Sequence, residues 1–134
     1  DVTVYTHADC KDILPTAIYG GKIDYYDTMP TVFQHSKLNL NITLKTIQTG
    51  IPLRAWDILG CGGFLLTNFQ QELCDFFIPG EDFVYYESPA DAIEKAAYFL
   101  SHDRERQEIT HNAFEKIAAS HTFHHRVQSM FEII

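Results

Sequence analysis

The chain has 134 residues, of which 46% are hydrophobic and 21% charged, a composition typical of one globular domain with its own core. Its net charge of −8 lies mainly in the second half: residues 1–67 contain five Lys or Arg against six Asp or Glu, and residues 68–134 contain five against twelve. The chain has no basic stripe and no apolar run of about 18 residues, so we expect no nucleic-acid partner and no membrane span.

The first third of the chain predicts two short strands and a short helix. Residues 2–5 alternate as a strand, residues 6–22 have the polar composition of a loop, and residues 23–25 are expected to form a second strand. A capping residue followed by Pro30 then predicts the start of a helix. Because the chain begins inside a strand rather than in a basic leader, we expect it to be part of a longer protein.

The middle of the chain predicts two strands joined by a helix. Residues 37–43 alternate with period two and place Leu38, Leu40 and Ile42 on one face of a strand. Pro52 opens a helix that ends at the glycines of residues 60–63. Residues 64–67 form a short continuous apolar run, which is typical of a strand buried on both faces.

The rest of the chain predicts a short helix around 70–74, a strand at 83–86 and three longer helices. The first long helix has Ser88 as its N-cap and proline at its first position, and the last is capped by Thr122. Each long helix has one apolar stripe at helical spacing. The stripes are Ile93, Ala96, Ala97 and Leu100, expected to face inward, then Ile109, Ala113 and Ile117, and finally Phe123, Val127, Met130, Phe131 and Ile134.

Strands that alternate with helices indicate βα units. They predict an α/β fold with a Rossmann-like, doubly wound parallel sheet and helices at the carboxyl-terminal end. The sequence contains no internal repeat, low-complexity stretch or linker, so residues 1–134 are expected to form a single domain.

The cysteines and histidines indicate neither disulfides nor a metal site. Cys10, Cys61 and Cys74 are odd in number and lack C-x-x-C spacing, so we expect reduced thiols in a cytoplasmic protein. The cluster of histidines in residues 121–125 has no cysteine or carboxylate beside it to complete a metal set. His7 follows the first strand and is expected to be a surface histidine rather than a catalytic base.

The loop after the strand at 37–43 carries the strongest functional signal. Ligands of open parallel sheets bind beyond the carboxyl ends of the strands, and residues 44–52 lead from such an end into a helix. A helix amino terminus has unpaired N–H groups and a partial positive charge, so it suits a phosphate. Gly50 allows a ligand to approach the backbone closely, and Pro52 fixes the first helical turn.

Two charged residues follow on this helix. Arg54 lies in the first turn, where a guanidinium can bind phosphate oxygens, and Asp57 lies one turn deeper, where a carboxylate can accept from the two hydroxyls of a ribose. The alternative is an exposed Arg54–Asp57 ion pair that contributes a few tenths of a kcal/mol, about 0.3, to stability.

The whole segment resembles a known family. Residues 50–67, Gly-Ile-Pro-Leu-Arg-Ala-Trp-Asp-Ile-Leu-Gly-Cys-Gly-Gly-Phe-Leu-Leu-Thr, resemble the G-x-P-x-x-x-x-E-A-x-A-x-G-x-x-V-x-T block of GT-B glycosyltransferases. Arg-x-x-Asp followed by Gly-Gly-Phe-Leu-Leu-Thr-Asn is similar to the branch related to spore maturation protein CgeB. The segments 21–23, 29–43, 79–82 and 122–126 also resemble family segments, in the same order along the chain.

This resemblance implies the carboxyl-terminal, donor-binding domain of a two-domain transferase that uses a nucleoside-diphosphate sugar. Asp57 stands where the second of two family glutamates binds the ribose, and Thr49 replaces the first glutamate, which contacts the donor sugar. Arg54 is expected to stabilise the leaving phosphate. Further donor-binding positions implied by the resemblance are Gly21, Ile23, Thr46, Thr49, Gly50, Ile51 and Leu53.

The resemblance also implies a hexosyltransferase type of enzyme without a cofactor. The sequence lacks Asp-x-Asp, the metal-binding signature of the other large glycosyltransferase fold, so a donor site that needs no metal is expected. The acceptor, which is a glycan, a small molecule or a protein, would be held by an amino-terminal domain outside this chain. A role in cell-surface polysaccharide synthesis follows from the same comparison, and the isolated domain is expected to turn over little or nothing.

Other functions remain open from the sequence. A sugar-nucleotide epimerase would use the same architecture, and a non-catalytic nucleotide-sugar-binding module would fit the replacement at Thr49. A phosphorylase would need a lysine for pyridoxal phosphate, and neither Lys37 nor Lys45 has the matching context. A receiver-like or flavodoxin-like domain would need an acidic pair or a phosphate loop after the first strand, and only Asp9 is near.

Overall fold

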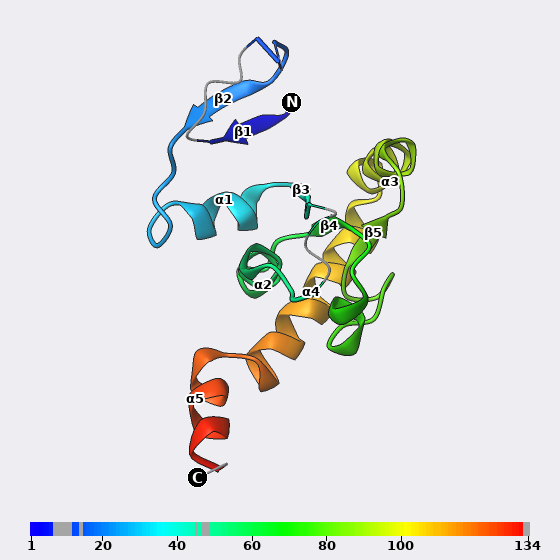
Figure 1. Ribbon diagram of the computed structural model, residues 1–134. Helices are drawn as coiled ribbons and strands as arrows, with labels where there is room; N and C mark the ends of the chain where they lie inside the picture. The colour runs from blue at the N-terminus through cyan, green and yellow to red at the C-terminus, as the bar shows by residue number, and fades with distance from the viewer. Residues whose placement is uncertain (7–11, 14, 45, 47–48, 133–134) are drawn as a thin grey trace.

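A computed structural model describes residues 1–6, 12–13, 15–44, 46 and 49–132 (Figure 1). All strand pairs in this described part are parallel, in a two-stranded sheet β1-β2 and a three-stranded sheet ordered β3-β4-β5. The predicted parallel α/β fold with carboxyl-terminal helices is therefore confirmed. The elements are β1 (Thr3–Tyr5), β2 (Ile18–Gly21), α1 (Met29–His35), β3 (Asn39–Asn41), α2 (Leu53–Gly60), β4 (Leu65–Asn68), the 3-10 helix η1 (Gln71–Asp75), β5 (Val84–Tyr86), α3 (Pro89–Ser101), α4 (Asp103–Ser120) and α5 (Phe123–Glu132).

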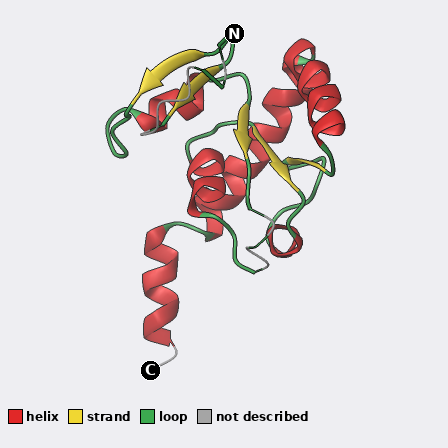
Figure 2. Ribbon diagram, turned by 45° about the horizontal axis from the view of Figure 1, so that its top comes forward, coloured by secondary structure: helices red, strands yellow, loops and turns green. Residues whose placement is uncertain are grey.

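The core lies on both faces of the three-stranded sheet, with helices on either side of the strands (Figure 2). β4 is the middle strand, and the apolar run at 64–67 is fully buried, as predicted. Leu65 packs with the buried face of α2, whereas the next residue, Leu66, points to the opposite face and packs with Phe99 of α3. α4 contributes to both sides, through Ile109 and Ala113.

β3 buries its polar side and exposes its apolar side. Leu40 and Ile42 share a face, as the alternation predicts, but they are 52% and 69% exposed, whereas Asn39 and Asn41 are buried. The buried amides are satisfied: Asn39 donates to the carbonyl of Phe33 at 3.0 Å, and Asn41 donates to the hydroxyl of a threonine in β4 at 3.0 Å. Hydrogen bonds to neighbouring elements therefore decide which face of this edge strand points inward.

The second strand lies at Ile18–Gly21, so the expectation of a strand at 23–25 is wrong. Residues 18–21 pair with β1, and Gly21 ends the strand with a φ of 72°. The side chain of Asp24 then accepts hydrogen bonds from the backbone N–H groups of residues 26–27, which fixes a turn where the strand was expected.

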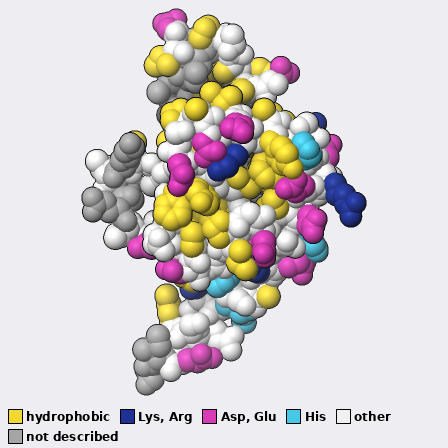
Figure 3. Space-filling view, turned by 90° about the vertical axis from the view of Figure 1, so that its right-hand side faces the viewer, with side chains coloured by type: hydrophobic (Ala, Val, Ile, Leu, Met, Phe, Trp, Pro, Cys, Tyr) yellow, Lys and Arg dark blue, Asp and Glu magenta, His cyan; other side chains and the backbone are white. Residues whose placement is uncertain are grey.

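The inward stripe expected for α3 is confirmed only at Ala96, which packs against the core. Ile93 and Leu100 are 71% and 47% exposed, and the helix packs through Phe99, which is 8% exposed and was not among the expected residues. The reason is that α3 contacts β5 and α4 together, and this places a different side of the helix against the core. Figure 3 looks onto the outer surface of the molecule on the side that carries α3, where hydrophobic side chains form separate patches among acidic ones.

The remaining predicted helices are confirmed in position. Ser88 caps α3 by accepting from the N–H of Asp91 at 3.2 Å, and Ile109 and Ala113 of α4 are buried. α5 begins after Thr122 and extends away from the rest of the molecule, so its apolar side chains are exposed (Figure 1). No helix among the described residues is long and apolar enough to cross a membrane.

Candidate functional site

A network of amides and hydroxyls lies where β3 and β4 end. The N–H of Thr43 donates to the amide oxygen of Asn68 at 2.7 Å, and the amide of Asn68 donates back to the carbonyl of Thr43 at 3.2 Å. The side chain of Gln70 donates to the Thr43 hydroxyl, and the amide of Asn41 donates to the hydroxyls of Thr43 and Thr67. This network holds the carboxyl ends of the two strands together at the point where residues 44–52 leave the sheet.

The loop that carries the predicted phosphate site returns to the protein at Gly50. Gly50 has a φ of 92°, a conformation that favours glycine, and its N–H donates to the carboxylate of Glu72 in η1. Thr46 and Thr49 are exposed, and residues 45, 47 and 48 lie outside the described part of the chain. Because Glu72 already holds the Gly50 N–H, the unpaired N–H groups at this end of α2 are those of its first turn.

The first turn of α2 carries Leu53 and Arg54, both exposed. Arg54 forms no hydrogen bond or ion pair with any residue that the structure describes, and no ion pair joins it to Asp57. The alternative of a structural Arg54–Asp57 pair is therefore not what the side chains adopt. A positive charge so close to a helix amino terminus is repelled by the helix dipole and is best balanced by an anion.

Asp57 faces the loop that follows β2. It is half-buried, and its carboxylate accepts a 2.8 Å hydrogen bond from the hydroxyl of Tyr25. This bond, together with burial and the Asp57 charge, raises the pKa of Tyr25 above its ordinary value. It also ties the turn that follows β2 to α2, two positions beyond the half-buried Ile23 and four beyond Gly21.

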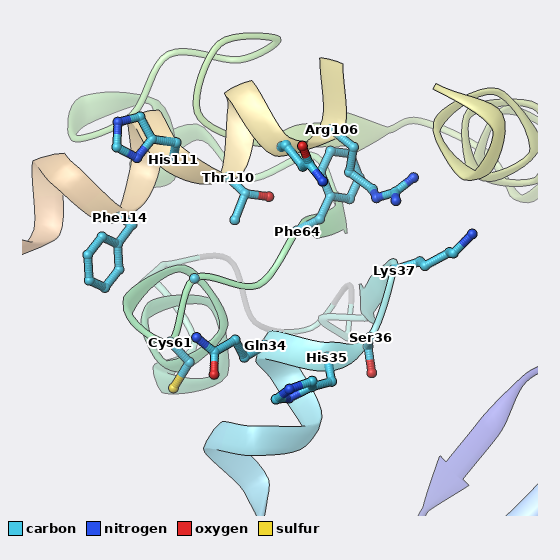
Figure 4. A pocket seen from close by; sticks show the side chains of 12 residues that line it. Gln34, His35, Ser36, Lys37, Cys61, Phe64, Arg106, Thr110, His111 and Phe114 are labelled. Carbon is cyan, nitrogen blue, oxygen red and sulfur yellow. The ribbon is translucent and has the colours of Figure 1, made fainter. Parts of the chain in front are cut away.

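A cavity of about 410 Å³ lies elsewhere, at the amino ends of β3 and β4. Figure 4 shows Thr110, His111 and Phe114 of α4 on one side of it, with Gln34 and Cys61 on the other. Arg106, at the edge of the cavity in the first turns of α4, already donates to the carbonyl of Phe99 and to the carboxylate of Asp103. None of the predicted site residues lines this cavity. The second cavity, of about 380 Å³, adjoins Ile51.

No group of three His, Cys, Asp or Glu side chains in the described part of the chain is arranged to hold a metal ion. Cys61 and Cys74 are free thiols, and burial raises the pKa of Cys61. Cys10 and His7, the one histidine expected near the strand ends, lie outside the described residues.

Sequence reasoning missed three features of the site: Tyr25, Glu72 and the amide network of β3. Tyr25 and Glu72 meet α2 and its loop across 32 and 22 positions of the chain, contacts that periodicity cannot reveal. The network did leave a signal. The polar positions of residues 39–43 are Asn, Asn and Thr without a single charge, which is unusual for a solvent-facing strand side and suits buried hydrogen bonding.

Comparison with protein-family models matches residues 5–132 to the family described as glycosyl transferase-like. The match extends from the end of β1 to the end of α5, so it includes the loop before α2, both charged residues of that helix and Tyr25. Comparisons with curated proteins and with solved structures give no match.

Proposed function

Since this chain belongs to the glycosyl transferase-like family, we propose that it is the donor-binding domain of a glycosyltransferase that uses a nucleoside-diphosphate sugar. Family membership supports glycosyl transfer, with a sugar donor and an acceptor. The finer assignment, to the carboxyl-terminal half of a GT-B enzyme of the CgeB-like branch, is our proposal and rests on the sequence of residues 50–67.

The observation that carries the proposal is the unpaired Arg54 in the first turn of α2. Leu53 and Arg54 present backbone N–H groups at this helix start, and the guanidinium has no partner among the described residues. A diphosphate bound here would accept hydrogen bonds from the backbone N–H groups and from the guanidinium, and the helix dipole would stabilise its negative charge. The exposed hydroxyls of Thr46 and Thr49 would lie at the edge of the same site.

The nucleoside would extend from this phosphate position toward Asp57. Its carboxylate already accepts a hydroxyl hydrogen bond, from Tyr25, and a ribose presents hydroxyls of the same kind. The base would then lie beside the backbone of Gly21 and Ile23. The side chains of Ile51 and Leu53 would supply the apolar sides of the phosphate site.

The chemistry proposed is stabilisation of the leaving group. As the bond between sugar and phosphate breaks, negative charge develops on the nucleoside diphosphate, and the helix terminus and Arg54 would offset that charge. The acceptor and any catalytic base would come from another domain, and no metal or resident cofactor takes part in this proposal.

A thermal-shift panel tests the proposal. The chain would be melted with UDP, GDP, ADP, CDP and dTDP and with their sugar conjugates, and one base is expected to raise the melting temperature in both forms. Saturation at a hundredfold excess over Kd corresponds to about 2.7 kcal/mol of added stability. If no nucleotide raises the melting temperature at millimolar concentration, the donor-domain proposal fails.

A non-catalytic binding module is the second candidate, favoured by Thr49 at the position where the family carries a glutamate. The two candidates predict the same nucleotide binding by this chain. They differ in the full-length protein, because only a transferase hydrolyses or transfers the sugar of its donor at a measurable rate.

A further inference from the structure

The second cavity opens beside the start of α2, between that helix, η1 and α5. It has a volume of about 380 Å³ and touches the proposed phosphate site through Ile51. Glu72 lines the cavity, and its carboxylate also accepts a hydrogen bond from the N–H of Gly50, so it contacts both the cavity and the loop before α2. A ligand whose diphosphate lies at α2 could therefore continue directly into this cavity.

One wall of the cavity is aromatic. The rings of Trp56 and Phe76 meet edge to face with centroids 5.4 Å apart, and the guanidinium carbon of Arg126 lies 5.5 Å and 5.7 Å from their centroids. This packing holds the Arg126 charge over the rings that line the cavity. The wall is thus an apolar surface with the Arg126 cation beside it.

The η1 side of the cavity carries two carboxylates. Glu72 and Asp75 are three positions apart in this 3-10 helix, where side chains at this spacing eclipse one another, so both project to the same side. Ionised carboxylates only accept hydrogen bonds. This side of the cavity therefore favours a neutral ligand rich in hydroxyl donors and disfavours a further phosphate.

We propose that this cavity receives the glycosyl group of the donor and that Glu72 is a specificity-determining residue that accepts from its hydroxyls. The inference rests on the proposed function, which supplies the diphosphate at the first turn of α2. Asp75 would accept from a second hydroxyl, and the Trp56–Phe76 wall would pack against the apolar face of the sugar ring. The carboxylate that contacts the sugar thus comes from η1 and not from the loop before α2.

Calorimetric titration of three variants tests the inference. The probes are the diphosphate that binds the wild type in the thermal-shift panel and its sugar conjugates, such as UDP with UDP-glucose and UDP-N-acetylglucosamine or GDP with GDP-mannose, and the same pair is used throughout. Glu72→Gln is expected to leave the affinity for the bare diphosphate within about twofold and to weaken the sugar conjugate about tenfold, because a charge-assisted hydrogen bond is lost. Asp75→Asn should act in the same direction more weakly. Glu94→Gln, an exposed acid of α3, is the matched control and should change neither affinity.

The outcomes separate the inference from the proposed function. If the wild type binds neither diphosphates nor their sugar conjugates, the proposed function fails and the inference with it. If the diphosphate binds but Glu72→Gln weakens both ligands equally, or weakens neither, the proposed function stands and the inference is overturned. A melting temperature measured for each variant shows whether Glu72 merely fixes the Gly50 loop, and Asp75→Asn repeats the test without touching the Gly50 contact.

Discussion

The hydroxyl of Tyr25 donates a hydrogen bond of 2.8 Å to Oδ2 of Asp57. Two parts of the chain that are far apart in sequence, the loop after β2 and the middle of α2, are joined by this contact. In the proposed function the ribose uses the same carboxylate. The chain therefore places a hydroxyl of its own on the carboxylate that the ribose would use, and the two hydroxyls would compete for Oδ2.

The first prediction follows from this competition. Asp57→Asn should weaken nucleotide binding by about 1–3 kcal/mol, because a hydrogen bond to a charged acceptor is lost. Tyr25→Phe should leave affinity unchanged or improve it by up to about 1 kcal/mol, because the competing hydrogen bond is gone. Isothermal titration of both variants with the same nucleotide measures the pair of effects. A large loss of affinity in Tyr25→Phe would show that the tyrosine supports the ligand.

The second prediction concerns the unpaired Arg54. Arg54→Ala should weaken binding of the nucleoside diphosphate by about 1.5–3 kcal/mol and should leave the bare nucleoside unaffected, because only the diphosphate offers charge to the guanidinium. The melting temperature without ligand should stay the same or rise slightly, since a cation is removed from the positive end of the helix dipole.

Arg104→Ala on α4 is the control, because this arginine is also exposed and lies on a different helix. It should alter neither titration. Equal losses for nucleoside and diphosphate in Arg54→Ala, or a marked fall of its melting temperature, would mean that Arg54 supports the fold and not the phosphates.

The third prediction tests a buried ion pair. Asp82 is 1% exposed, accepts from the N–H of Ile78 at 2.7 Å and pairs with Lys116 of α4. Lys116→Met leaves the buried carboxylate without its cation and should lower the free energy of unfolding by about 1–3 kcal/mol. This is less than the roughly 3–5 kcal/mol for a fully buried pair, because the lysine is partly exposed. Urea denaturation measures it, and Lys22→Met, in an exposed loop, should change little.

The fourth prediction is a pH dependence. Burial lowers the pKa of His121, and the nearby charges of Arg126 and His125 lower it further. The folded protein therefore takes up this proton at lower pH than the unfolded chain, whose histidine titrates near pH 6.5. Its contribution to stability is complete above that pH and is lost as the pH falls from there toward the pKa of the folded state.

His121→Phe should remove this component while keeping the contacts with Trp56, Phe76 and Phe77. Melting temperatures of both proteins between pH 5 and pH 8 would be compared. The wild type should lose stability relative to the variant as the pH falls. Parallel curves over the whole range would show that His121 titrates normally.

Much of the fold could be predicted because several segments carry consistent local signals. The apolar run at 64–67 is buried, and α2 begins after Pro52 and ends at Gly60, as the sequence predicts. α3 shows the limit. Its sequence offers two apolar sides, one with Ile93 and one with Phe99, and only contacts with β5 and α4 decide between them.

The candidate site also has parts that the local sequence predicts and parts that depend on packing. The order of glycine, proline and charged residue predicts the loop and the helix start before Arg54. Glu72 and Tyr25 reach the site from other elements, and their contribution depends on how those elements pack against α2. Neither lies at a spacing that links it to Asp57 in the sequence.

The buried amides of β3 also determine how this strand aligns with its neighbour. Asn39 pairs with Leu65 and Asn41 with Thr67 in the parallel register, and the Asn41 amide meets the Thr67 hydroxyl only in this alignment. An aliphatic strand could slide by two residues and still bury apolar side chains. Here a slide would leave amide groups buried without partners, at a cost of about 1–3 kcal/mol each. Polar matching thus favours one alignment of β3, although this strand lies at the edge of its sheet and pairs with β4 alone among the residues that the structure describes.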